Sequence, residues 1–380
     1  MLNLLEKKEK KVEYIELIYD LIFVYMIGRN NALLHITENG FVKTEALLAY
    51  VFCTLAIIQI WNFTTFYINL FGRNGVRDHI FLFINMYLMY FIGQSVREDF
   101  ELYITQYHIA WGLILVNIGL QYLLELRNQK DQPDNRALCR RMLLPLSVEA
   151  VLVFIGAFTD ETVGVVLSAA AILAGIVLTM LSRRKTPGAS VDFAHLTERA
   201  MLYVVFTFGE MIIALAVYFN NGGRWSLNTV YFSLMAFLIV VGLFLSYGYM
   251  YDHIIDREGN GDGMLYMIIH IFIIFAMNNI TASLEFMREE EIDLLPKMLF
   301  LVLSLVAYFS FLLLLKDNAK YRCRPTKPFM LKAGTATAVF IVLMVLLREN
   351  MAVNILISVL YVFLIFLTLY TTYKNAEKSG

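Results

Sequence analysis

Long apolar stretches separated by short polar segments recur along the whole chain. Most are about 18 or more residues long, the length that a helix needs to cross the hydrocarbon core of a bilayer. The pattern predicts an all-α integral membrane protein with about twelve transmembrane helices. The expected spans are residues 14–36, 42–70, 79–96, 102–126, 142–158, 162–182, 195–218, 227–250, 263–285, 297–315, 328–347 and 352–373.

The apolar pattern also indicates an internal repeat. A shift of 184 residues places WNFTTFYIN (61–69) on LSYGYMYDH (245–253) and matches Asp78 with Asp262. Both copies follow an even number of spans, so the two halves would share an orientation. We therefore expect one compact transmembrane unit built from two six-helix halves, residues 1–182 and 183–380.

Composition supports a membrane protein and excludes an ordinary soluble domain. Hydrophobic residues make up 59% of the chain, and the mean hydropathy is +0.63. The net charge of −1 says nothing about an acidic or basic partner, and no nucleic acid partner is expected. Membrane lipid is the partner that this composition implies.

Lys and Arg lie unevenly on the two sides of the predicted spans. If the amino terminus is cytoplasmic, 23 of the 31 lie on cytoplasmic segments, seven lie on the opposite face, and Arg199 lies within a span. This asymmetry follows the positive-inside rule. The lysine-rich start has no apolar core or cleavage site of a signal peptide. We expect a multi-pass protein of the bacterial cytoplasmic (inner) membrane, with both termini cytoplasmic.

Cysteine and proline positions exclude some alternatives. Cys53, Cys139 and Cys323 fit no CxxC pair or metal spacing, so we expect neither a disulfide framework nor a metal site. All six prolines fall in predicted loops or at predicted helix ends. The pattern therefore shows no helix broken in mid-span, a feature of many transporter binding sites.

Ionisable side chains inside the predicted spans are the candidates for chemistry, because each costs about 2.5–3.5 kcal/mol to insert. Glu16 and Asp20 are four residues apart and share one helix face. The candidate site residues are Glu16, Asp20, His195, Glu198, Arg199, Glu210 and His270.

All but Glu210 of these residues fall in the inner third of three outward-running spans, and Glu149 and Glu210 lie deeper. With Glu149 and Glu285, the spans hold six carboxyls against one Arg and two His. Some of the carboxyls must be neutral, or must be paired with water, a cation or a substrate. The alternative is structural: Arg199 neutralises a carboxylate, and the histidines hydrogen-bond between helices.

Other sites have weaker support. His195 and Glu198 resemble half of a carboxylate–histidine metal site, but no second half follows. No Walker P-loop, GxSxG or HExxH motif is present, so no cofactor is expected. The aromatic stretch WNFTTFY (61–67) is typical of a lipid-facing or interhelical surface, and a binding-pocket wall is the alternative.

Two polar stretches resemble the signatures of the bacterial low-temperature-requirement A (LtrA) family. VEYIELIYDLIFVYMIGR at the first span resembles its opening E-L-x-x-D-L motif, and HLTERAMLYVVFTFGEMIIALA at the seventh resembles its H-x-x-E-R…G-E motif. The resemblance covers residues 12–373. It marks Glu16, Asp20, His195, Glu198, Arg199, Gly209, Glu210 and His270. One departure follows the second span, where relatives have an acidic residue and this chain has Asn69-Leu70-Phe71-Gly72.

The resemblance implies a cold-growth phenotype but no biochemical activity. We expect a transporter or permeation protein whose inner polar cluster binds a proton, a cation or a small polar substrate. In it Arg199 tunes the carboxyls, His195 or His270 titrates, and Glu210 is a deeper relay. One alternative is an intramembrane enzyme acting on a lipid or lipid-linked substrate, with His195 and Glu198 as acid and base. Another is a non-catalytic sensor or scaffold for cold or envelope stress.

Overall fold

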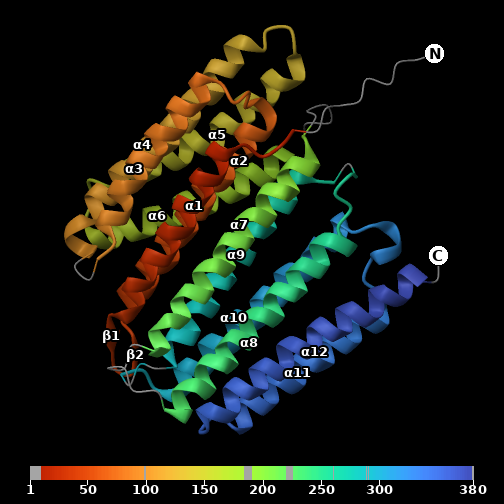
Figure 1. Cartoon of the computed structure of the whole chain (residues 1–380). Helices are drawn as coiled ribbons and strands as arrows, with labels where there is room; N and C mark the ends of the chain where they lie inside the picture. Colours follow the sequence, from red (N-terminus) through yellow and green to blue (C-terminus); the bar gives the residue numbers. More distant parts are fainter. Residues whose placement is uncertain are drawn as a thin grey trace. The chain divides into compact units, whose positions relative to one another are not determined.

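The computed structural model describes residues 10–97, 100–183, 191–219, 226–259, 261–287, 289 and 291–378. The described part is almost entirely helical (Figure 1). Its α-helices are α1 (Tyr14–Asn30), α2 (Thr44–Phe71), α3 (Val76–Ser95), α4 (Phe100–Asn128), α5 (Pro133–Gly156), α6 (Glu161–Arg183), α7 (Phe193–Ala214), α8 (Leu227–Tyr249), α9 (Gly263–Phe286), α10 (Leu294–Leu314), α11 (Lys327–Leu346) and α12 (Met351–Lys378).

Short elements connect or extend these helices. They are the 3₁₀ segments η1 (Asn31–His35), η2 (Leu215–Phe219), η4 (Leu315–Asn318) and η5 (Tyr321–Cys323), and the π-helical turn η3 (Met250–Ile254) after α8. Strands β1 (Thr37–Glu38) and β2 (Phe41–Val42) form an antiparallel hairpin. Its turn, Asn39–Gly40, has φ angles of 52° and 79°, which Asn and Gly adopt more readily than other residues.

Each predicted span falls on one of these helices, and the largest difference is in α5. The expected span began at residue 142, whereas α5 begins at Pro133 and encloses Pro145. The expectation that every proline lies in a loop or at a helix end is therefore wrong for Pro145. A proline inside a helix removes one backbone hydrogen bond, and here the helix continues through it to Gly156.

Eight of the described helices are long and apolar enough to cross a membrane. They are α2, α4, α6 and α8 to α12. The other four helices are α1, α3, α5 and α7, which carry most of the ionisable side chains singled out above. Helix α1 is only 17 residues long, whereas α5 and α7 hold ionisable residues within their length.

The chain divides into two compact units. The first comprises residues 1–30, 51–203 and 257–268, and the second comprises residues 31–50, 204–256 and 269–380. Helices α2, α7 and α9 contribute residues to both. These units are interleaved along the chain, and the expected division into halves at residue 182 stays a prediction.

The first unit is a bundle in which helices that follow one another pack together. Helix α3 packs on α4, α4 on α5 and α5 on α6, and α1 packs on α3 (Figure 1). Gly93 of α3 lies against Met26 of α1. Near the start of α7, Phe193 packs edge-on against Tyr266 of α9, with ring centroids 5.4 Å apart.

The second unit is centred on α12, which packs against α8, α10 and α11. Gly242 of α8 lies directly against Val362 of α12. The Tyr231 hydroxyl, near the start of α8, donates to the Ala352 carbonyl near the start of α12 at 2.8 Å. Tyr249, at the end of α8, packs against Tyr370 of α12.

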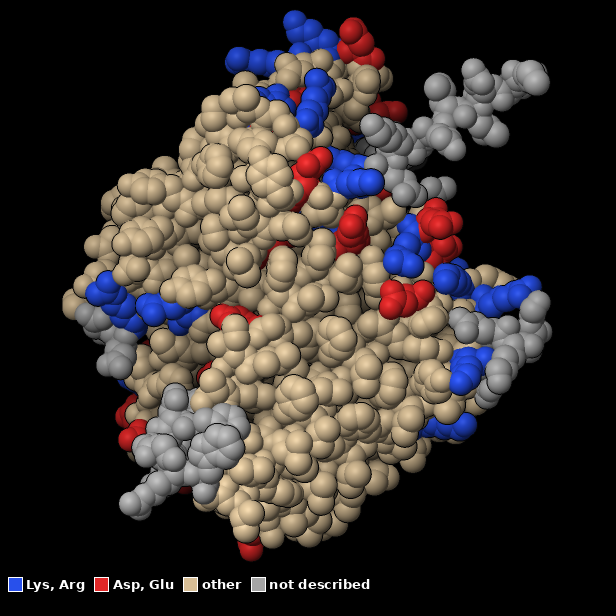
Figure 2. Space-filling model, viewed as in Figure 1, with Lys and Arg blue, Asp and Glu red and all other residues tan. Residues whose placement is uncertain are grey.

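Broad areas of the surface in Figure 2 carry neither basic nor acidic side chains. Many large apolar side chains are exposed, such as Leu331 and Val342 of α11 and Leu173 of α6. Apolar patches of this kind are unusual on soluble proteins. Lipid is the medium that covers such helix faces without cost.

Candidate functional site

The innermost part of the candidate site is an ion pair between Asp20 of α1 and Arg199 of α7. Both residues belong to the first unit, and both are 0% exposed. Arg199 Nη2 donates to Asp20 Oδ1, and Arg199 Nε lies 3.4 Å from Oδ2. Trp61 of α2 donates its indole N–H to Asp20 Oδ1 at 2.8 Å. Three donors from two helices therefore hold this carboxylate.

Glu16 lies one turn before Asp20 on the same face of α1 and has poorer partners. Arg199 Nη1 is 3.0 Å from Glu16 Oε2, and His195 Nε2 is 3.5 Å from the same oxygen. Neither contact has hydrogen-bond geometry. The other oxygen, Oε1, accepts the backbone N–H of Glu13 at 3.4 Å. Three buried polar atoms therefore meet in close ion pairs that lack hydrogen-bond geometry.

Asn69, near the end of α2, determines the protonation of His195. Its Oδ1 accepts the backbone N–H of Asp192 at 3.1 Å, and its Nδ2 donates to the Asp192 carbonyl at 2.7 Å. These contacts orient the amide, so the Nδ2 group that lies 3.1 Å from His195 Nδ1 is a donor. His195 Nδ1 must then be unprotonated. This contact selects the tautomer with the proton on Nε2, the nitrogen that faces Glu16.

The chain brings these residues together through its helix ends. Asp192 precedes α7, and its Oδ1 accepts the backbone N–H of His195 at 3.1 Å, which is an N-cap interaction. Lys10 donates its ammonium to the carbonyls of Ile68 and of Gly72, the latter at 2.9 Å, at the end of α2. A cation is favourable at a helix C-terminus. Burial lowers the pKa of the Lys10 ammonium from its usual value, although Glu16 opposes this shift.

A chain of neutral polar side chains adjoins the site. Tyr19 shares a 3.0 Å hydrogen bond with Thr64 and accepts one from Asn85 at 3.1 Å. Asn85 in turn accepts one from Asn117 at 2.8 Å. Thr64 donates to the Ile60 carbonyl, so the Tyr19 hydroxyl donates to Thr64. The chain links α1, α2, α3 and α4 around the residue that precedes Asp20.

The structure does not bring every predicted residue into this site. Glu198 is half-buried, and it forms no hydrogen bond or ion pair with the described residues. Glu210 and His270 belong to the second unit. Glu210 is half-buried there, and His270 is fully buried, with Nε2 3.0 Å from the Tyr247 hydroxyl.

Several site residues were not predicted from the sequence. Trp61, within the stretch expected to be a packing surface, is fully buried and holds Asp20. Lys10, Asp192 and Asn69 were also missed, although Asn69 had been noted as a departure from the LtrA pattern. The sequence signal that could have identified them is a polar residue at the end of an apolar helix. That signal does not indicate which residue it contacts.

A second buried ion pair lies at the end of the first unit. Arg77 of α3 is 2.6 Å from Glu125 of α4, which is fully buried. The Arg77 guanidinium also donates to the Tyr67 hydroxyl at 3.2 Å and contacts Asp78 at 3.4 Å. Each carboxylate has a cationic partner, so this group is a structural clamp between helix ends.

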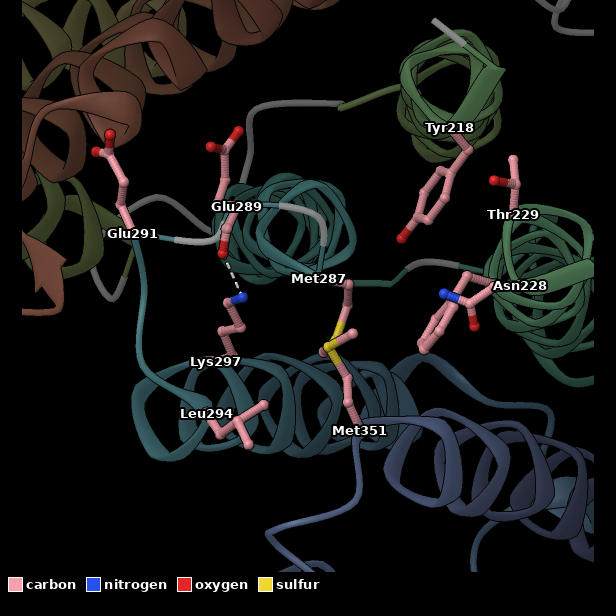
Figure 3. A pocket seen from close by; sticks show the side chains of 10 residues that line it. Tyr218, Asn228, Thr229, Met287, Glu289, Glu291, Leu294, Lys297 and Met351 are labelled. Carbon is pink, nitrogen blue, oxygen red and sulfur yellow. Dashed lines mark hydrogen bonds between the residues drawn. The ribbon is translucent and has the colours of Figure 1, made fainter. Parts of the chain in front are cut away.

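The second unit contains a pocket of about 680 Å³. Figure 3 shows Tyr218, Asn228, Met287 and Met351 around it, with glutamates to one side. The Tyr218 hydroxyl donates to the Leu284 carbonyl at 2.5 Å, and Lys297 donates to the Glu289 carbonyl. These polar groups are engaged within the protein. Among the described residues, no three His, Cys, Asp or Glu side chains are grouped to hold a metal ion.

Comparison with known proteins identifies the family. The model of the bacterial low temperature requirement A protein (LtrA) family matches residues 11–369. No curated protein and no solved structure matches the chain significantly. The match includes both helices that form the Glu16–Asp20–His195–Arg199 site. The chain therefore belongs to the LtrA family of bacterial membrane proteins.

Proposed function

We propose that this protein is a transporter or permeation protein of the bacterial cytoplasmic membrane, in which Glu16 takes up and releases a proton or a small cation. The observation that carries the proposal is the charge of the buried site. Glu16 and Asp20 carry two negative charges when ionised, and Arg199 carries one positive charge. His195 is held neutral by Asn69. One negative charge is left without compensation inside the protein.

The charged groups around the site do not remove this imbalance. Lys10 lies toward Glu16 and Arg199, and Asp192 and Asp78 lie toward Lys10. The Asp192 carboxylate accepts the Lys10 backbone N–H at 3.3 Å and also attracts the Lys10 ammonium, so Lys10 and Asp192 together add no net charge to the site. An uncompensated buried charge is costly. A proton or cation at Glu16 would remove that cost.

Glu16 is the exchangeable residue because its contacts are weaker than those of Asp20. Asp20 accepts hydrogen bonds from Trp61 and Arg199, and these stabilise its ionised form. The Glu16 oxygen nearest to His195 and Arg199 has no partner in hydrogen-bond geometry. A carboxyl group with few hydrogen-bond partners in either its protonated or its ionised form can gain or lose a proton or a cation at low cost.

The proposal includes twelve crossings with both termini cytoplasmic. Within the first unit, the Lys10 segment meets the end of α2 and the start of α7, as alternating crossings require. Within the second, the starts of α8 and α12 meet at Tyr231 and Ala352. The 23-to-7 distribution of Lys and Arg supports the orientation.

Proteoliposomes that contain the full-length protein and a luminal pH dye would test the proposal. In one assay, a potassium diffusion potential set with valinomycin drives protons, and we expect the wild-type protein to let the luminal pH change. In a second assay, we expect the wild type to change the luminal pH in response to an imposed sodium gradient, or to dissipate that gradient. Gln resembles a neutral Glu in shape but cannot release a proton. Glu16→Gln should therefore lower the flux by about tenfold or more.

Glu198→Gln is the matched control, because Glu198 also lies near the start of a helix but has no polar partner among the described residues. Its flux should equal that of the wild type. A wild-type protein that moves neither protons nor sodium would contradict the proposal and leave the Glu16 site with a structural role, as the sensor or scaffold alternative requires. A Glu16→Gln variant with full flux would assign transport to another residue.

A further inference from the structure

A second buried carboxyl lies in the first unit, apart from the Glu16 site. Glu149 of α5 is 0% exposed. Its Oε2 accepts a hydrogen bond from Gln59 Nε2 of α2 at 2.9 Å. No Lys, Arg or His of the described chain forms an ion pair with Glu149. Its surroundings are therefore polar but uncharged.

Three polar atoms of this site, one of them in the carboxyl itself, are buried without a hydrogen bond. They are Glu149 Oε1, Gln59 Oε1 and the indole nitrogen Nε1 of Trp111. They come from three helices, α5, α2 and α4. Trp111 directs its indole N–H toward the carboxyl without reaching hydrogen-bond geometry. Side chains from three helices therefore face one small polar volume.

Gly175 of α6 forms the fourth side of this volume. A Cβ atom at Gly175 would lie 1.9 Å from Gln59 Nε2 and 2.2 Å from Glu149 Oε2. Both distances are far below van der Waals contact, so any other residue would displace the pair. The missing side chain leaves the space in which Gln59 and Glu149 meet.

We infer that Glu149, Gln59 and Trp111 form a second proton-binding site, in which Glu149 holds a proton at neutral pH. An ionised carboxylate here would face Gln59, Trp111 and Gly175, and no cation among the described residues pairs with it. Oε2 accepts from Gln59, and we assign it as the carbonyl oxygen because that oxygen is the stronger acceptor in a carboxylic acid. This assignment places the proton on Oε1, which has no hydrogen-bond partner. This inference does not depend on the function proposed for Glu16.

Infrared spectroscopy of the full-length protein in lipid nanodiscs would test the site. We expect a carboxylic acid C=O band at neutral pH that is missing in Glu149→Gln. Gln59→Leu should keep this band but move it to higher frequency, because a hydrogen bond to the carbonyl oxygen weakens the C=O bond. Glu210→Gln is the control and should leave the band unchanged.

Loss of a carboxylate band, instead of an acid band, in Glu149→Gln would show that Glu149 is ionised and would overturn the inference. An acid band that does not move in Gln59→Leu would also contradict the site, since Gln59 then makes no bond to that oxygen. If Glu149→Gln does not fold, the Gln59→Leu shift alone decides the matter, because that variant keeps the acid.

Discussion

Asn69 and His195 show how one amide can set the charge of a buried site. An aspartate at position 69 would lack the N–H group that donates to His195 Nδ1, and its carboxylate would accept a proton from that nitrogen instead. The imidazole would then be stable as the cation. The charge of the Glu16 site therefore depends on a side chain that does not contact Glu16.

We expect Asn69→Asp to place a proton on His195 Nδ1, because a carboxylate at position 69 can only accept a hydrogen bond from that nitrogen. Nitrogen-15 NMR of histidine-labelled protein would detect the change, because the shifts of Nδ1 and Nε2 report protonation. In the wild type Nε2 alone should carry the proton. His195→Gln assigns the signal by removing it. A wild-type spectrum with protonated Nδ1 would contradict the orientation assigned to Asn69.

Glu16 and Asp20 should respond differently to the same substitution. Glu16→Gln removes an uncompensated charge, so we expect unfolding in detergent at the wild-type temperature or higher. Asp20→Asn places an amide donor against Arg199 or Trp61 in place of an acceptor. It should cost about 1–3 kcal/mol, the penalty for an unsatisfied buried polar group. Equal melting temperatures for the two variants would contradict the distinction drawn between the carboxyls.

Two glycines in the second unit differ in what surrounds them, although both lie inside helices. A Cβ atom at Gly242 of α8 would lie 2.4 Å from Val362 Cγ1 of α12, whereas nothing lies within 4 Å of one at Gly209 of α7. Val362 is fully buried, and its branched side chain has few alternative rotamers. Contact between α8 and α12 therefore depends on Gly242.

Gly242→Ala should be less stable than Gly209→Ala by about 1–3 kcal/mol, the usual cost of overpacking. Both variants gain the same helix propensity, about 1 kcal/mol, so the difference isolates packing. Thermal unfolding of the purified variants in one detergent would measure it. Similar stabilities would contradict this prediction, because they would show that Val362 and α12 accommodate the added methyl group without loss of stability.

The proposed topology can be tested by labelling single cysteines in intact cells. Gln132 and Lys320 are exposed and should react only from the cytoplasm, while Asp160 and Asn350 are exposed and should react only from outside. The native Cys53, Cys139 and Cys323 are buried, so the unaltered protein serves as the unlabelled control. A cytoplasmic label at Asp160 would contradict the twelve-span arrangement.

The helices and the family could be read from the sequence alone. Apolar runs predicted the position of each described α-helix, and eight of these helices are long and apolar enough to cross a membrane, where every backbone polar group must be bonded within the helix itself. The paired positions Glu16 and Asp20, and the signature around His195 and Arg199, also indicated where α1 and α7 carry buried charge. Ionisable residues within an apolar run can be recognised from the sequence, because inserting each of them into the membrane is costly. Pro145 was misplaced because α5 extends into a charged segment that hydropathy assigns to a loop.

Only the tertiary structure showed how the polar residues are paired. Glu198 lies one residue before Arg199 and has the same side chain as Glu16, yet it has no partner among the described residues. Trp61 and Asn69 come from an apolar helix, and Lys10 comes from the segment before α1. Asn69 and Lys10 reach the site because the C-terminal end of α2 meets the start of α7 there. Sequence predicts which groups are costly to bury, whereas their compensation depends on directions and distances between helices, which no local pattern specifies.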